Sequence, residues 1–162
     1  MSIAVGDTLP EGQFIVMGDE GPTALSTADL LGSGKTVIFG LPGAYTGTCT
    51  TAHVPSFIRV ADDLAAKGVT GIACLSVNDP FVMAAWGDAT GATTAGIKML
   101  ADADGSFVEA LGLQFSAPPV GLINRSKRFS MVVEGGKVTH LNVDENPGVC
   151  ETSAGEALLE AL

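Results

Sequence analysis

The chain has 162 residues and a formal net charge of −10, from 18 acidic and 8 basic side chains. This charge argues against a nucleic-acid backbone or an anionic membrane as a partner. With 46% hydrophobic and 16% charged residues, the sequence is typical of a globular protein, and its length predicts one domain over residues 1–162.

The first residues and the cysteines indicate where the protein works. Residues 1–7 contain no basic side chain and reach an acidic one at Asp7, unlike a secretory signal peptide. No apolar run approaches the roughly 20 residues needed to span a bilayer. Three cysteines are an odd number, which favours thiol chemistry over a set of structural disulfides. We therefore expect a cytoplasmic protein.

The first predicted elements are a hairpin and a short helix. Residues 12–17 and 23–25 flank a Gly-Asp-Glu-Gly turn, which favours two paired strands. Ser26 can cap a helix that runs through Leu31. The glycines and lysine that follow resemble the end of a phosphate-binding loop, but Asp29 stands where such a loop needs glycine, which argues against nucleotide binding.

A turn rich in Pro, Gly and Thr joins a buried strand to an amphipathic helix. The apolar run at residues 36–39 predicts the strand. After Cys49, apolar residues recur in steps of three and four, which predicts one buried helix face. That face consists of Val54, Phe57, Ile58, Ala61, Leu64 and Ala65. Pro55 lacks the N–H that would bond back to Thr51, so we expect the helix to bend there.

The middle of the chain alternates strands and helices. Residues 71–77 are nearly continuously apolar, as in a central strand of a sheet covered on both faces. Asp79 and Pro80 fit the cap and first turn of a helix. The inner side of that helix is expected to carry Phe81, Val82, Ala85 and Trp86. A strand at 97–100 and a short helix at 107–111 follow.

The last third predicts a hairpin and a final helix. A strand begins at residues 121–124, and residues 127–133 and 137–143 flank a Gly-Gly turn. Ser153 is expected to cap the last helix. The buried side of that helix would carry Ala157, Leu158 and Leu162. The whole layout predicts an α/β fold with a mixed central sheet flanked by helices.

Cys49 is the residue around which the chemistry is organised. It falls in the first turn of a predicted helix, where unpaired backbone N–H groups and the helix dipole favour an anion. A thiolate is such an anion. The sequence therefore predicts a reactive sulfur at this position.

Three motifs around this cysteine resemble those of the peroxiredoxins. Pro42, Thr46 and Cys49 fit the Pro-x-x-x-Thr-x-x-Cys signature, and the run through His53 is similar to the type II, or peroxiredoxin-five, subfamily. The other two motifs are Val77-Asn78-Asp79-Pro80-Phe81-Val82-Met83 with Trp86, and Arg128-Phe129-Ser130-Met131-Val132-Val133. Two departures are Tyr45, where the subfamily usually has Phe, and Gly47, where Pro is frequent.

The resemblance implies a thioredoxin-like fold and a set of site residues. Cys49 would attack a peroxide oxygen and become a sulfenic acid. Thr46 would hydrogen-bond the sulfur and the peroxide, and Pro42 would shield the sulfur. Arg128, which precedes Phe-Ser-Met, would stabilise the thiolate and the polarised O–O bond. Arg125 is the alternative arginine for this role.

The remaining histidines and cysteines have weaker assignments. His53 lies four residues after Cys49 on the same helix face and is expected to support the site by packing or hydrogen bonding; a general base is the alternative. Cys74 is expected in the core. Cys150 lies in a loop before the last helix and is a possible resolving cysteine. His140 is expected to be structural, and these scattered residues give no metal-binding spacing.

The resemblance implies a thiol-dependent peroxidase that reduces hydrogen peroxide and small organic hydroperoxides, without metal, haem or flavin. A thiol reductant (glutathione, glutaredoxin or thioredoxin) would recycle Cys49, and the protein would form a homodimer. Disulfide exchange is a weaker possibility because Cys49 is not part of a Cys-x-x-Cys motif. The alternative from another class is a non-catalytic redox sensor or binding protein that Cys49 oxidation switches.

Overall fold

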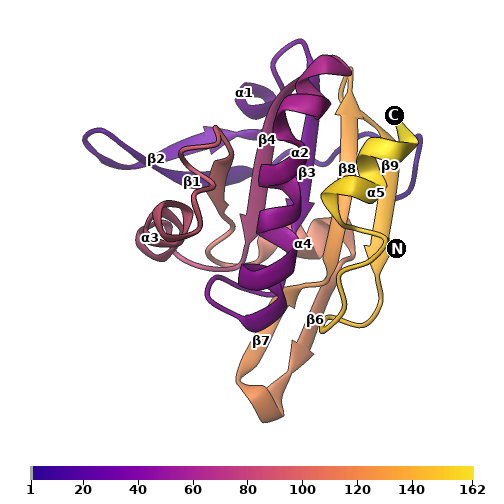
Figure 1. Cartoon of the computed structure of the whole chain (residues 1–162). Coiled ribbons are helices and arrows are strands. Elements are labelled where there is room, and N and C mark those ends of the chain that lie inside the picture. The colour runs from indigo at the N-terminus through magenta and orange to yellow at the C-terminus, as the bar shows by residue number, and fades with distance from the viewer. Residues whose placement is uncertain (1) are drawn as a thin grey trace.

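The structure, a computed structural model, describes residues 2–162. Its centre is a seven-stranded sheet in the order β2-β1-β5-β4-β3-β8-β9 (Figure 1). The strands are β1 (Gln13–Gly18), β2 (Gly21–Ser26), β3 (Lys35–Gly40), β4 (Val69–Ser76), β5 (Lys98–Ala101), β6 (Gln114–Ala117), β7 (Leu122–Ser126), β8 (Arg128–Glu134) and β9 (Lys137–Asp144). The α-helices are α1 (Thr27–Leu31), α2 (Val54–Ala66), α3 (Pro80–Thr90), α4 (Ser106–Leu111) and α5 (Gly155–Ala161).

The sheet is mixed, as the alternation of elements predicts. β3, β4 and β5 run parallel, whereas β1 pairs antiparallel with β5 and β8 pairs antiparallel with β3. β4 stands in the middle of the order, which confirms the central strand expected at residues 71–77. Both predicted hairpins are present, as β1–β2 and β8–β9.

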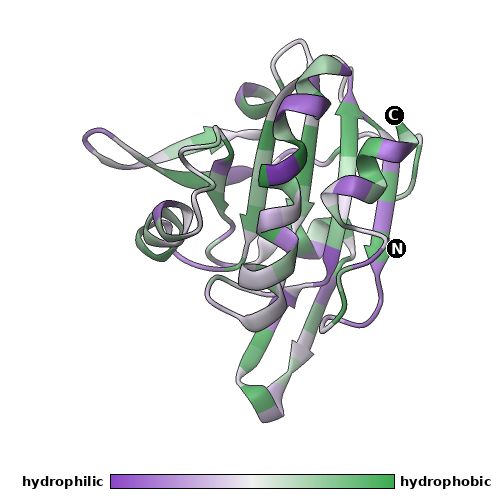
Figure 2. Cartoon of the chain, viewed as in Figure 1, coloured by the Kyte–Doolittle hydropathy of each residue, from purple (hydrophilic) through white to green (hydrophobic). Residues whose placement is uncertain are grey.

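Two apolar layers cover the two faces of the sheet. Alternate residues of β3 divide between them: Val37 and Phe39 face the layer of α2, α3 and α5, whereas Ile38 faces the layer of α1 and α4. In Figure 1, α2 and α5 lie over the face of the sheet that is turned to the viewer. Figure 2 shows apolar residues throughout the central strands, as burial on both faces requires.

The orientation predicted for α3 is wrong in part. Phe81 is 64% exposed and Ala85 is also exposed, while Met83 and Trp86 are fully buried. Almost every residue of this helix is apolar, so hydrophobic spacing cannot tell its inner side from its outer side. The N-terminus is as predicted, because the Asp79 side chain accepts a hydrogen bond from the Val82 N–H.

The helix after Cys49 differs from the prediction at its start. Residues Cys49–His53 form a π-helical turn, η1, in which the Val54 N–H bonds to the Cys49 carbonyl. The regular helix α2 then begins with Pro55 in its first turn, where a missing N–H costs nothing. The wide π-helical turn before Pro55 thus accommodates the missing N–H of this proline. Ala65, expected on the buried face, is exposed.

Two further elements were misread from the sequence. Ser153 does not cap α5, because Ala154 is the N-cap and the Ser153 hydroxyl donates to Asp144 instead. Of the three residues expected inside that helix, Leu158 is buried, and Ala157 and Leu162 are partly exposed. The strand β6, which pairs with β7 outside the main sheet, was not predicted. The short 3-10 turn η2 (Pro118–Val120) joins these two strands.

Candidate active site

The loop after β3 delivers Cys49 to the start of a helix. The chain leaves the sheet at Gly40, and helical backbone resumes at Gly47, so Cys49 lies in the first turn as predicted. Tyr45 has a φ of 63°, an uncommon value for a non-glycine residue, and this allows the tight turn before Thr46. The Cys49 side chain is fully buried.

Arg128 reaches the cysteine from β8. In the antiparallel pairing of β3 with β8, Gly40 is opposite Phe129, so Arg128 lies just beyond the end of β3, beside the loop. Its Nη2 lies 3.3 Å from the Cys49 sulfur and donates a hydrogen bond to it. Its Nε has no partner among the described residues. A fixed positive charge with an unused donor therefore stands beside the sulfur.

Two further contacts hold the Arg128 guanidinium in place. Nη2 also donates to the Pro147 carbonyl over 2.8 Å, and Nη1 lies 3.1 Å from Nδ1 of His53. Arg128 is 1% exposed, so these contacts are shielded from water. A buried arginine held at three points loses little freedom when it stabilises a developing charge.

His53 is a neutral hydrogen-bonding partner in this arrangement. Its Nε2 lies 3.0 Å from the Ser153 carbonyl, which can only accept, so Nε2 carries the proton and Nδ1 accepts from Arg128. Burial, and then the charge of Arg128, lower the pKa of His53 from 6.5 to about 3. Both ring nitrogens are occupied, which favours the supporting role over a general base.

Thr46 and Pro42 belong to the same loop. The Thr46 hydroxyl donates to the Gly43 carbonyl over 2.7 Å. No hydrogen bond joins Thr46 to Cys49 among residues 2–162, so the expected contact with the sulfur is not made here. Because its proton is committed, this hydroxyl presents lone pairs to a bound molecule. Arg125 donates to the Pro42 carbonyl over 3.2 Å, so it holds the loop, while Arg128 contacts the sulfur.

A cavity of about 280 Å³ opens beside these residues. It has a polar side, formed by Thr46, Thr48 and Arg128, and an apolar side that includes residues of β6 and β7. Its lining consists of Pro42, Thr46, Gly47, Thr48, Phe115, Ala117, Val120, Leu122, Arg128, Pro147 and Gly148. Cys49 is adjacent, in contact with Arg128. A small molecule in this cavity would meet the guanidinium and the threonine hydroxyl together.

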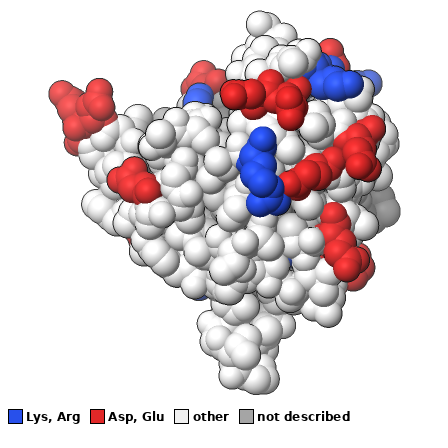
Figure 3. Space-filling view, viewed as in Figure 1, with Lys and Arg blue, Asp and Glu red and all other residues white. Residues whose placement is uncertain are grey.

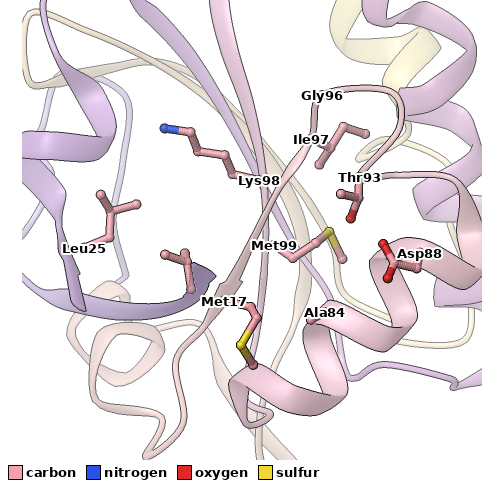
Figure 4. Close-up of a pocket in the computed structure, with 10 residues that line it drawn as sticks. Met17, Leu25, Ala84, Asp88, Thr93, Gly96, Ile97, Lys98 and Met99 are labelled. Carbon is pink, nitrogen blue, oxygen red and sulfur yellow. The ribbon is translucent and has the colours of Figure 1, made fainter. Parts of the chain in front are cut away.

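A larger hollow of about 530 Å³ lies elsewhere, among the β1–β2 hairpin, α3 and β5 (Figure 4). Met17, Leu25 and Met99 give it an apolar lining, and Asp88 and Lys98 are its charged residues. No cysteine or histidine lines it. We therefore place the reactive site at the smaller cavity.

The other two cysteines, Cys74 and Cys150, lie in different environments. Cys74 is buried in β4, and burial raises the pKa of its thiol well above the ordinary value. Cys150 is half-buried in the loop before α5, and burial raises the pKa of its thiol as well. All three cysteines are free thiols in this structure. The resolving role of Cys150 stays a prediction.

The site also uses groups that sequence reasoning missed. Pro147 and Ser153, both in the loop before α5, contribute backbone carbonyls to Arg128 and His53. Any residue type can supply a carbonyl, so no side-chain motif marked them. Thr50 is a further case: its hydroxyl accepts a hydrogen bond from the Trp86 indole over 3.1 Å and ties η1 to α3.

Three further features concern the charges, the metal-binding groups and the helices of the described residues. Acidic side chains are spread over several separate places on the face shown in Figure 3. Within residues 2–162, no group of three or more His, Cys, Asp or Glu side chains is arranged to hold a metal ion. None of the helices in the same range has the length and apolar character needed to cross a membrane.

Comparisons with known proteins give one consistent family. The family model described as Redoxin matches residues 4–159. Peroxiredoxin-2C of Oryza sativa subsp. japonica is 44% identical over 161 residues, which cover 99% of this chain and 98% of that protein. Reduced Prx3 from Vibrio vulnificus, solved in complex with H2O2, is 45% identical with a TM-score of 0.91 over 98% of each chain. Peroxiredoxin 5 from Alvinella pompejana is 30% identical with a TM-score of 0.85, over 98% of this chain and 97% of that one.

Proposed function

Because this chain belongs to the peroxiredoxin family, has the thioredoxin-like fold and is a thiol peroxidase, we propose that Cys49 is the sulfur that attacks the peroxide. The observation that carries the assignment is the 3.3 Å contact between Arg128 Nη2 and the Cys49 sulfur. No other cysteine has such a contact among the described residues. The comparisons favour an enzyme over the redox sensor that was the alternative.

The oxidation step follows from the groups around the cavity. The Cys49 thiolate attacks one peroxide oxygen, the S–O bond forms and the O–O bond breaks. The sulfur loses two electrons and becomes a sulfenic acid, while the other oxygen leaves as water or alcohol after taking a proton. Arg128 stabilises the negative charge on the leaving oxygen, and the Thr46 hydroxyl accepts a hydrogen bond from the peroxide O–H.

The substrates proposed are hydrogen peroxide and small organic hydroperoxides. The cavity supports both, since its polar side can hold the O–O group and its apolar side, with Phe115 and Leu122, can contact an alkyl group. No metal, haem or flavin takes part in this scheme. A thiol reductant then attacks the sulfenic acid, forms a mixed disulfide and releases water.

The reductant remains a choice among glutathione, glutaredoxin and thioredoxin. Cys150 would make it a two-cysteine enzyme if its thiol attacked the sulfenic acid first. We also propose membership of the type II (peroxiredoxin-five) subfamily, which the 30% identity to the Alvinella pompejana protein supports.

A homodimer and a cytoplasmic location complete the proposal. Tyr45, 57% exposed beside the site, and Phe81, 64% exposed on α3, are large apolar side chains that a second copy would cover. Sedimentation of the wild type and of Phe81→Ser tests this association. The location rests on three free cysteines, which suit a reducing compartment.

Peroxide consumption with dithiothreitol tests the assignment. Wild type, Cys49→Ser and Cys150→Ser are compared at equal concentration. We expect repeated turnover by the wild type and none by Cys49→Ser. An active Cys49→Ser enzyme would refute the assignment, and consumption of a single equivalent by the wild type would favour a sensor. Mass spectrometry after one equivalent of peroxide distinguishes a Cys49–Cys150 disulfide from a sulfenic acid.

A further inference from the structure

Three residues of the loop between β9 and α5, namely Pro147, Gly148 and Ser153, contact the site through their backbone carbonyls. The Pro147 carbonyl accepts from Arg128 over 2.8 Å, and the Ser153 carbonyl accepts from His53 over 3.0 Å. The Gly148 carbonyl also accepts a hydrogen bond from Thr48 over 3.0 Å. The loop has no regular secondary structure from residue 145 to 150. Something other than a helix or sheet ladder must fix these carbonyls.

Asp144 supplies that constraint for the part of the loop that carries Ser153. It is the last residue of β9 and is 7% exposed. Oδ1 accepts from the Thr152 N–H over 3.0 Å and from its hydroxyl over 2.7 Å. Oδ2 accepts from the Glu151 N–H over 3.1 Å, and from the Ser153 N–H and hydroxyl over 3.2 and 2.6 Å. One carboxylate thus gathers five donors from three consecutive residues.

Asp144 lies close to the site, so its hydrogen bonds to the loop can affect Arg128. In the β8–β9 pairing, Asp144 is directly opposite Arg128. The carboxylate nevertheless forms no ion pair with the guanidinium, because its hydrogen bonds go to the loop. Ser153 is the connecting residue: its N–H and hydroxyl bind Asp144 while its carbonyl binds His53, which in turn binds Arg128.

We propose that Asp144 is a positioning residue for peroxide reduction, which sets the orientation of Arg128 at the Cys49 sulfur through Ser153 and His53. This inference rests on the proposed function. The charge of the carboxylate matters because hydrogen bonds to an ionised acceptor are about twice as strong as neutral ones. Although burial opposes ionisation, the hydrogen bonds from Ser153 and Thr152 lower the pKa of the Asp144 carboxyl from 3.8 to about 2.

Asp144→Asn is the first test, because it keeps the shape and removes the charge. The amide also places two N–H donors opposite the N–H and O–H donors of the loop, so the hydrogen bonds that hold the loop are lost. The control is Glu145→Gln, which changes the neighbouring exposed carboxylate that pairs with Lys127. The rate constant for reaction of the reduced enzyme with hydrogen peroxide is measured by competition with horseradish peroxidase. We expect Asp144→Asn to lower it at least about tenfold, and Glu145→Gln to leave it unchanged.

A second readout separates positioning from general loosening of the fold. The pH profile of Cys49 alkylation by iodoacetamide is measured for the same variants, along with their melting temperatures. Asp144→Asn is expected to move the profile to higher pH, since a displaced Arg128 stabilises the thiolate less. Ser153→Ala removes a single hydrogen-bond donor and keeps the Asp144 carboxylate. We expect it to change the rate constant and the pH profile in the same direction as Asp144→Asn, but by a smaller amount.

The decisive comparison uses the Arg128→Met background. If Asp144 acts through Arg128, Asp144→Asn changes the remaining rate less than about twofold there. A full additional tenfold loss would overturn the inference, as would wild-type rates in Asp144→Asn or Ser153→Ala. Cys49→Ser distinguishes failure of the proposed function from failure of this inference. An active Cys49→Ser enzyme would refute the proposed function. An inactive Cys49→Ser enzyme together with an unaffected Asp144→Asn enzyme would refute this inference alone.

Discussion

The buried histidine makes the stability of the fold depend on pH from about 6.5 downwards. His53 is neutral in the fold, with a pKa lowered from 6.5 to about 3 by burial and by Arg128. In the unfolded chain it binds a proton below pH 6.5, so unfolding takes up a proton between these two values. Stability from this group is complete above pH 6.5 and is lost as pH falls towards 3. The equilibrium constant for folding therefore falls roughly a hundredfold between pH 6 and pH 4, which lowers the free energy of unfolding by about 2 to 3 kcal/mol.

His53→Gln removes this dependence while keeping both contacts, because the amide can donate to the Ser153 carbonyl and accept from Arg128. Urea unfolding is followed by circular dichroism at pH 7, 6, 5 and 4. We expect the free energy of unfolding to fall less steeply in His53→Gln than in the wild type. Equal slopes in His53→Gln and the wild type would contradict the reasoning.

Three further pairs of substitutions test the site and its support. Arg128→Met should lower the rate constant for peroxide at least about a hundredfold, and Arg125→Met should lower it less, because Arg125 contacts only the loop; equal losses would argue against this division of roles. Thr46→Ser should retain most activity in a peroxide-consumption assay and Thr46→Val should lose it, since only serine keeps the hydroxyl; similar activities would rule out that hydroxyl. Gly155→Ala should cost about 1 to 3 kcal/mol in urea unfolding, since its Cβ would lie 2.6 Å from a backbone oxygen of α2, whereas Gly71→Ala, where nothing lies within 4 Å, should cost less.

Local patterns in the sequence predicted most of the sheet and failed where the pattern was ambiguous. The strands at the centre are long apolar runs, and turn residues mark both hairpins. In contrast, α3 is apolar on nearly every side, and Phe81 was placed inside although it is exposed. β6 has only four residues, so its alternation of polar and apolar side chains was too short to indicate a strand.

The site could be predicted only as far as side chains carry motifs. Cys49 and Thr46 are close in sequence, so their proximity follows from the loop. Arg128 lies 79 residues from Cys49 and was assigned from a family resemblance, since no spacing rule joins β8 to the loop. The contributions of Pro147 and Ser153 are backbone carbonyls, which depend on the path of the chain and leave no trace in residue type.

The hydrogen bond between Trp86 and Thr50 gives the protein an internal optical reporter. Trp86 is the only tryptophan in the chain, it is fully buried, and its indole N–H binds the turn that carries Cys49. A change in this turn when the sulfur is oxidised would alter the surroundings of the indole and hence its fluorescence. Stopped-flow emission from unlabelled protein would then resolve the oxidation and reduction steps separately, and Thr50→Val would show how much of the signal passes through this one bond.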